Sequence, residues 1–266
     1  MIPVILTALA VVAGVGLIAA VLLALASHFL AVKEDETVKH VRECLPGVNC
    51  GACGFTGCDD YAKAVAEGRA KTNLCIPGAD SVAAEIAGIM GVKAEDVVEM
   101  KAHVRCNGNC EAAPKKAVYS GINTCSAASM VYAGPNACRF GCLGCGDCAV
   151  ACPSGAICIK DGIAHVIEER CTGCGLCATK CPKKIIELIP QIKYVTVMCS
   201  SEDKGAVARK ACSNACIGCK KCELGCEEKA ITVVNNLAHI DYDKCTGCGK
   251  CAENCPTHCI KLNKVG

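Results

Sequence analysis

Four stretches of the sequence carry four cysteines each at the same close spacing, C-x2-C-x2-C-x3-C. They begin at Cys142, Cys171, Cys216 and Cys245, and three of the four runs continue with a proline. Thiolates brought this close together bind iron–sulfur clusters or zinc, or form disulfides in an oxidising compartment. The total cysteine content helps to choose among these chemistries.

The chain has 266 residues and 29 cysteines. A typical disulfide scaffold is a much shorter chain with an even number of cysteines, so this sequence does not fit one. Zinc sites usually use separate C-x2-C pairs, whereas four complete runs at a fixed internal period favour [4Fe–4S] clusters. A zinc-binding membrane adaptor remains the alternative outside redox chemistry.

The last cysteine of each run identifies the ligand sets. In two-cluster ferredoxins, three cysteines of a run bind one cluster and the fourth binds the other cluster. Glu227 replaces the proline after Cys226, but the ligand itself is present. The expected sets are cluster 2, Cys142, Cys145, Cys148 and Cys181; cluster 3, Cys171, Cys174, Cys177 and Cys152; cluster 4, Cys216, Cys219, Cys222 and Cys255; and cluster 5, Cys245, Cys248, Cys251 and Cys226.

An earlier group has a different spacing, C-x2-C-x4-C-x16-C, and consists of Cys50, Cys53, Cys58 and Cys75. The glycines between these cysteines let the backbone wrap closely around an anionic cluster. We expect this group to hold cluster 1, with a zinc knuckle as the alternative. The acidic residues after Cys58 predict a helix that ends near Gly68.

Nine cysteines lie outside these sets. At a sequence offset of 74, Cys125 and Cys138 align with Cys199 and Cys212. A candidate sixth cluster therefore has the ligands Cys106, Cys110, Cys125 and Cys138, with reduced structural thiols as the alternative. This alignment gives Cys199 and Cys212 no companion ligands. The three remaining cysteines, Cys44, Cys158 and Cys259, are interpreted as packing residues.

The same offset of 74 residues relates two homologous modules. Within each module, short strands are expected to position the cysteine runs. Residues 156–167 and 230–241 each predict a hairpin, with Asp-Gly and Asn-Asn at the turns. Residues 80–100 predict two short helices that are separated near Gly91, with a cap at Asp80 or Ser81.

The first 32 residues contain no Lys, Arg, Asp or Glu, and as a helix they exceed the hydrocarbon thickness of ~30 Å. They predict a transmembrane helix, with a signal peptide as the alternative. Lys33, Lys39 and Arg42 follow this segment, which indicates that the rest of the chain lies on the cytoplasmic side.

These elements predict an α+β protein. Its expected parts are a transmembrane helix over 1–32, a small helical [4Fe–4S] domain over 33–80, a connector with the candidate sixth cluster over 81–137, and two tandem bacterial 2[4Fe–4S] ferredoxin-like modules over 138–190 and 191–266. The net charge of +2 and an aromatic content of 3% exclude nucleic-acid binding as a function. No pattern of catalytic residues or phosphate-binding loop is found, so bond-making chemistry is expected on a partner.

The order of these motifs carries a resemblance. An apolar N-terminal segment, then "LPGVNCGACGFTGCDDYAKAVAEG" with Cys75, then "CLGCGDCAVACPSGAI", resembles the B subunits of the Rnf complexes in a long form with two ferredoxin modules. This resemblance implies a single-pass subunit of the cytoplasmic membrane, with at least five [4Fe–4S] clusters on the cytoplasmic side.

The resemblance also implies a role in ion transport. Rnf complexes are ion-translocating ferredoxin:NAD+ oxidoreductases, in which the B subunit takes electrons from reduced ferredoxin. It passes them to the other membrane and peripheral subunits, which carry the flavin and NAD sites. The runner-up is an iron–sulfur subunit of another membrane redox complex, of the hydrogenase or formate-oxidising type.

Overall fold

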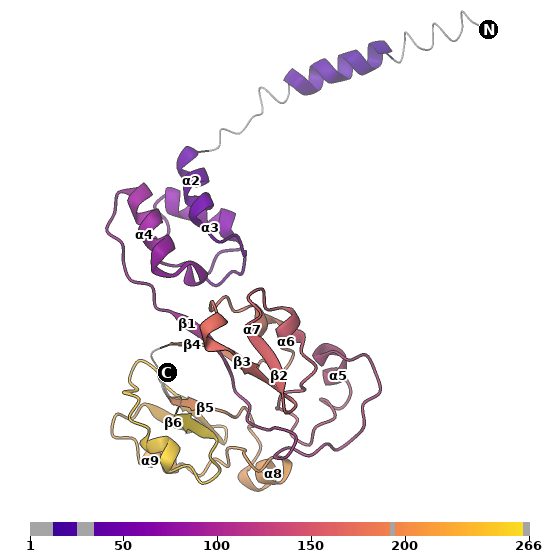
Figure 1. Ribbon diagram of the computed structural model, residues 1–266, viewed down its shortest axis with the longest axis vertical. Coiled ribbons are helices and arrows are strands. Elements are labelled where there is room, and N and C mark those ends of the chain that lie inside the picture. Colours follow the sequence, from indigo (N-terminus) through magenta and orange to yellow (C-terminus); the bar gives the residue numbers. More distant parts are fainter. Residues whose placement is uncertain (1–12, 26–34, 192–194, 263–266) are drawn as a thin grey trace, which may run out of the picture.

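The computed structural model describes residues 13–25, 35–191 and 195–262. From residue 35 onward, the chain forms a helical unit, a first repeat and a second repeat in that order (Figure 1). The helical unit and the first repeat each enclose a hydrophobic cluster, and the cluster of the second repeat also includes Ala112, Ala113 and Cys138 of the first.

The transmembrane helix predicted over residues 1–32 requires a correction, as does the single-pass location in the cytoplasmic membrane. None of the helices in the described ranges is long and apolar enough to cross a bilayer. The part of this segment that is described forms a helix over residues 13–25. Residues 1–12 and 26–32 lie outside the described residues.

The helical unit (residues 35–91) contains α2 (Glu36–Cys44), α3 (Cys58–Ala66), the 3-10 turn η1 (Ile76–Gly78) and α4 (Ala79–Met90). The Asp35 carboxylate caps α2 by accepting the Thr37 N–H. The helices pack around Val41, Tyr61 and Ile86, which are almost fully buried. The helix predicted after Cys58 is confirmed as α3.

The second helix predicted between Gly91 and residue 100 does not form. Gly91 ends α4 in a left-handed conformation, and residues 93–99 have no regular structure. Polar contacts hold this segment extended: Asp80 accepts the Val97 N–H at 2.7 Å, and the Asn73 side chain donates to the Asp96 carbonyl at 3.2 Å. These tertiary hydrogen bonds outweigh a modest local preference for helix.

The first repeat contains four strands that form two antiparallel pairs, β1 with β4 and β2 with β3. Its elements are β1 (Met100–Val104), α5 (Cys125–Met130), α6 (Asp147–Val150), β2 (Ile157–Lys160), β3 (Ile163–Val166), the 3-10 turn η2 (Glu168–Arg170), α7 (Leu176–Lys180) and β4 (Ile186–Pro190). β1 belongs to the region interpreted as a connector, yet it forms one of the two sheets of this repeat by pairing with β4.

The second repeat has the same arrangement, with β5 paired to β8 and β6 paired to β7. Its elements are β5 (Val195–Val197), α8 (Gly205–Ala211), α9 (Lys221–Leu224), β6 (Ile231–Val234), β7 (Leu237–Ile240), α10 (Lys250–Glu253) and β8 (Ile260–Leu262). The short helices α6, α7, α9 and α10 each contain the third cysteine of a run, so each cysteine loop leads directly into a helix.

Both predicted hairpins are confirmed, as β2–β3 and β6–β7. Their turn residues, Asp161-Gly162 and Asn235-Asn236, all have positive φ angles. A two-residue type I′ turn requires this conformation at both positions, and Asp, Asn and Gly adopt it most readily. The turns thereby fix the strand register next to the cysteine loops.

Candidate iron–sulfur sites

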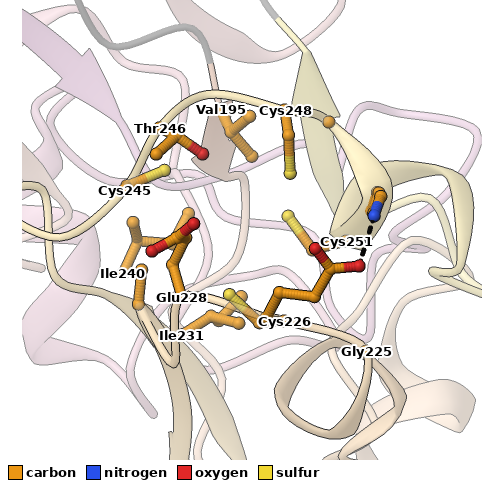
Figure 2. A pocket seen from close by; sticks show the side chains of 14 residues that line it. Val195, Gly225, Cys226, Glu228, Ile231, Ile240, Cys245, Thr246, Cys248 and Cys251 are labelled. Carbon is orange, nitrogen blue, oxygen red and sulfur yellow. Dashed lines mark hydrogen bonds and ion pairs between the residues drawn. The ribbon is translucent and has the colours of Figure 1, made fainter.

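The predicted ligands of cluster 5 surround one cavity in the second repeat. The sulfur atoms of Cys226, Cys245, Cys248 and Cys251 face this cavity, and Ile231 and Ile240 form part of its apolar wall (Figure 2). At its rim, the Lys250 ammonium lies 2.5 Å from the Glu227 carboxylate. The residue that replaces the usual proline thus makes an ion pair beside the site.

The predicted ligands of cluster 4, Cys216, Cys219, Cys222 and Cys255, line a second cavity together with Cys259. The Cys259 sulfur lies 3.6 Å from the Cys255 sulfur. Hydrogen bonding with the Cys259 thiol lowers the pKa values of Cys216 and Cys255, which favours the thiolate form that binds iron. The buried Cys259 was interpreted from the sequence as a packing residue, and its contact with this site was missed.

The predicted ligands of cluster 2 also come together, and Cys125 joins them. Cys142, Cys148 and Cys181 line one cavity with Cys125. Burial raises the pKa of Cys145 to about 11, and the neighbouring Cys125 makes the second largest contribution to this increase. The Asp147 carboxylate accepts the Cys125 N–H at 2.8 Å and so attaches the start of α5 to this site.

The predicted ligands of cluster 3 lie within electrostatic range of one another. Burial raises the pKa of the Cys177 thiol to about 11, with further contributions from Cys171, Cys174 and Cys152. The Ala156 N–H donates to the Cys152 sulfur at 3.3 Å. Such amide contacts help to stabilise the negative charge of cluster thiolates.

The predicted ligands of cluster 1 are brought together in the helical unit. Burial raises the pKa of the Cys75 thiol to about 11; the neighbouring Cys58, Cys53 and Cys50 also raise it, by less than the burial does. The pKa of Cys50 is raised by burial and, to a smaller extent, by Cys174 of the first repeat. The loop that carries Cys174 therefore lies close to the helical unit.

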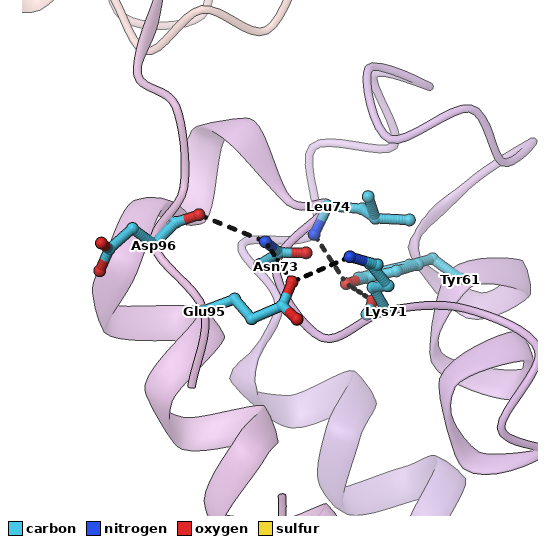
Figure 3. Close-up of polar contacts among 6 residues, drawn as sticks. All are labelled: Tyr61, Lys71, Asn73, Leu74, Glu95 and Asp96. Carbon is cyan, nitrogen blue, oxygen red and sulfur yellow. Dashed lines mark hydrogen bonds and ion pairs between the residues drawn. The ribbon is translucent and has the colours of Figure 1, made fainter. Parts of the chain in front are cut away.

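A tyrosine hydroxyl holds the loop that leads to Cys75. Tyr61 is 1% exposed; its hydroxyl donates to the Lys71 carbonyl at 2.8 Å and accepts the Leu74 N–H at 3.3 Å (Figure 3). Burial raises the pKa of Tyr61 to about 12, so the hydroxyl stays protonated.

We expect Tyr61→Phe to destabilise the helical unit by about 1–2 kcal/mol, because the Leu74 N–H and Lys71 carbonyl lose a buried partner. The measurement is anaerobic guanidinium unfolding of the holoprotein, followed by circular dichroism. Tyr119→Phe is the matched control, because the Tyr119 hydroxyl bonds only within an exposed loop. Equal effects of the two substitutions would contradict this assignment.

The sequence-derived sixth set is not brought together. Cys110 is exposed and its N–H bonds to the Asp161 carbonyl at the β2–β3 turn, while Cys125 lies at the cluster 2 site. The other two members, Cys106 and Cys138, line a separate cavity with Cys199 and Cys212. The alignment of the repeats at an offset of 74 residues did not predict this grouping. A signal was present in the sequence, because a cysteine follows two positions after the end of β1 and two positions after the end of β5.

The donor sets fit iron–sulfur clusters. Across the described ranges, no three or more His, Cys, Asp or Glu side chains are arranged to hold a single metal ion. The thiolates of a cubic cluster bind four different irons, so they stand farther apart than the ligands of one ion. Positive-φ glycines such as Gly144 and Gly173 occur inside the cysteine loops, where the backbone must turn closely.

Comparison with protein families agrees with this chemistry and defines the class as an iron–sulfur protein with several [4Fe–4S] clusters. A family described as "Putative Fe-S cluster" matches residues 45–77, and a 4Fe-4S dicluster domain matches 141–185. Two 4Fe-4S binding domain models match residues 213–229 and 238–261.

Curated relatives narrow the class to one family. The B subunit of the Na(+)-translocating ferredoxin:NAD(+) oxidoreductase complex of Acetobacterium woodii is 44% identical, over 92% of this chain and 74% of the relative. The B subunit of the ion-translocating oxidoreductase complex of Methanosarcina acetivorans is 38% identical, over 97% and 98%. The chain belongs to this family, the B subunits of Rnf complexes, and is an iron–sulfur electron-transfer subunit.

Proposed function

We propose that the chain relays electrons from reduced ferredoxin into a ferredoxin:NAD+ oxidoreductase complex of the Rnf type. The names of the Acetobacterium woodii and Clostridium ljungdahlii relatives support the reaction, since both are subunits of ferredoxin:NAD(+) oxidoreductase complexes. In this proposal the other subunits of the complex carry the flavin and NAD sites.

We assign at least five [4Fe–4S] clusters to the ligand sets derived from the sequence, clusters 1 to 5. Each bound cluster supplies one-electron chemistry, and the chain supplies thiolates, amide contacts and an apolar surround. The corresponding parts are a single-cluster domain over 33–80, a connector over 81–137, and ferredoxin modules over 138–190 and 191–266.

The observation that carries the proposal is the close approach of the two loops that carry the ligands assigned to clusters 1 and 3. Cys50 of the helical unit lies within electrostatic range of Cys174, and the Gly173 backbone packs against Ile76, the residue after Cys75. Because separate parts of the chain place their sulfur ligands side by side, electrons can pass from one part to the next. A storage protein or a zinc adaptor has no need of such contacts.

The test is metal analysis of protein purified without oxygen. We expect about twenty to twenty-four irons per chain with matching acid-labile sulfide, no zinc, and low-potential EPR signals after dithionite reduction. Reduced ferredoxin should then reduce the same clusters in a mixing experiment. Stoichiometric zinc with little iron would overturn the relay, while full clusters that ferredoxin fails to reduce would overturn only the donor.

A further inference from the structure

A cavity between the two repeats collects four cysteines that no predicted cluster uses as a set. Its wall includes Cys106 and Cys138 from the first repeat and Cys199 and Cys212 from the second. All four are buried, with exposed fractions between 6% and 9%. Four thiols from distant parts of the sequence therefore meet in one shielded space.

The two repeats supply these cysteines in equivalent ways. Cys106 follows β1 and Cys199 follows β5, each two residues beyond the last strand residue. Cys138 and Cys212 each lie four residues before the first cysteine of a run, Cys142 or Cys216. The site thus has approximate two-fold symmetry, with one pair of thiols from each repeat.

Backbone amides point at these sulfurs as they do at cluster ligands. The Cys142 N–H donates to the Cys106 sulfur at 3.3 Å, and the Cys216 N–H donates to the Cys199 sulfur at 3.3 Å. The Ser201 N–H makes a further bond to the Cys199 sulfur at 3.4 Å. Hydrogen bonds of this kind stabilise thiolates and tune bound clusters.

The cavity is similar in size to two of the other sites. Its empty volume, open solvent included, is about 380 Å³, compared with about 300 Å³ at the cluster 4 ligands, about 340 Å³ at the cluster 2 ligands and about 770 Å³ at the cluster 5 ligands. Gly108 and Gly141 lie against it, and a Cβ at either position would approach the Cys106 sulfur to within 3.7 Å. The absence of a Cβ at these two positions leaves the space beside the Cys106 sulfur open.

Contacts between the repeats hold the four thiols in place. The Asn107 N–H donates to the Met198 carbonyl at 3.0 Å, and the Asn214 side chain donates to the Asn107 carbonyl at 2.9 Å. The Ser200 hydroxyl donates to the Arg105 carbonyl at 2.7 Å. Since these bonds join residues next to Cys106 and Cys199, the site is organised by the interface itself.

We propose that Cys106, Cys138, Cys199 and Cys212 bind an additional [4Fe–4S] cluster that connects the two ferredoxin modules. Its ligands Cys106 and Cys199 bond directly to the backbone of a cluster 2 ligand and a cluster 4 ligand. The spatial order of clusters is then 1, 3, 2, the new cluster, 4 and 5. One electron leaves cluster 2 or 4, reduces the new cluster and passes to the other neighbour, without transfer of protons or bonds. This transport role rests on the proposed relay, whereas cluster binding does not.

The experiment counts clusters in anaerobic full-length protein by iron and sulfide analysis, EPR spin quantitation and native mass spectrometry. We expect six clusters in the unmodified chain and five in Cys199→Ser and Cys212→Ser, a loss of about four irons each. The control is Cys110→Ser, which removes an exposed thiol of the sequence-derived set and should leave six clusters.

The outcomes separate the competing assignments. Five clusters in the unmodified chain, or an unchanged count in both Cys199→Ser and Cys212→Ser, would overturn the additional cluster. A zinc ion that is lost in Cys212→Ser would show that the site binds zinc instead. Loss of four irons in Cys110→Ser would support the sequence-derived set. A count of five clusters in the unmodified chain overturns the proposal even where a variant fails to fold. With six clusters, the folded variant among Cys199→Ser, Cys212→Ser and Cys110→Ser decides between the two ligand sets. A chain without iron would refute the relay as well.

Discussion

Gly173→Ala is expected to cost about 2–5 kcal/mol of stability and to separate cluster 1 from cluster 3. Gly173 has a φ of +68°, where a side chain costs about 1–2 kcal/mol. Its new Cβ would overlap the Met100 carbonyl oxygen of β1 and lie 3.0 Å from the Ile76 side chain. Overpacking of this kind costs about 1–3 kcal/mol more. The loop that carries Cys174 must move away from the helical unit.

Anaerobic unfolding of the holoprotein measures the loss of stability, and EPR measures the spin coupling between reduced clusters 1 and 3. Gly155→Ala is the matched control, because Gly155 also has a positive φ of +59° but no atom within 4 Å of a new Cβ. It should lose only about 1–2 kcal/mol and keep the coupling. Equal losses in the two variants would show that the contact with Met100 and Ile76 has no role.

Acidification from pH 7 to pH 5 is expected to destabilise the interface between the repeats through His103. This β1 residue is 8% exposed, bonds to the backbone of Val197 in β5, and has no hydrogen-bond partner for Nε2 within the described chain. Burial, with a smaller contribution from Arg105, lowers its pKa to about 4 from an ordinary value of 6.5. A protonated ring would bury a charge and an unsatisfied N–H.

The sign follows from the two pKa values. Above pH 6.5 the ring is neutral in both states and has no effect; between pH 6.5 and about 4 the unfolded chain takes up the proton first. The free energy of unfolding should therefore fall by about 2 kcal/mol at pH 5. Below about pH 4 the folded state is protonated as well, so the difference stops growing.

His103→Thr tests this contribution, because β5 of the second repeat has the buried Thr196 at the equivalent position. We expect the variant to lack this part of the pH dependence while it retains any effect of acid on the clusters themselves. The measurement is the difference between the unfolding profiles of the two proteins at pH 5 and pH 7. Parallel profiles would contradict a neutral buried His103.

The spacing of chemically distinctive residues predicted much of the site. Turn residues such as Asp161-Gly162 require a particular backbone, so both hairpins could be derived locally. The ligand runs are equally local, because three of their four cysteines lie within seven positions. These features depend little on the rest of the fold.

Features that depend on tertiary structure were harder to predict. Thirty-two positions separate Cys106 from Cys138, but only thirteen separate Cys199 from Cys212, so a constant offset aligned Cys199 with Cys125. The grouping that we propose becomes visible only when β1 and β5 are compared, since each strand is followed two positions later by a cysteine. Likewise, the extended course of residues 93–99 depends on Asp80 and Asn73, which lie far back in the sequence.

The cavity between the repeats also bears on how the protein is made. By the time Cys181 has left the ribosome, the ligands assigned to clusters 1, 2 and 3 have all been synthesised. Cys106 and Cys138 form only half of the cavity's set of four cysteines until Cys199 and Cys212 of the second repeat have also been synthesised. Loading of this cavity therefore cannot finish during synthesis of the first repeat. A chain truncated before Cys199 would carry Cys106 and Cys138 without the two thiols that face them across this cavity.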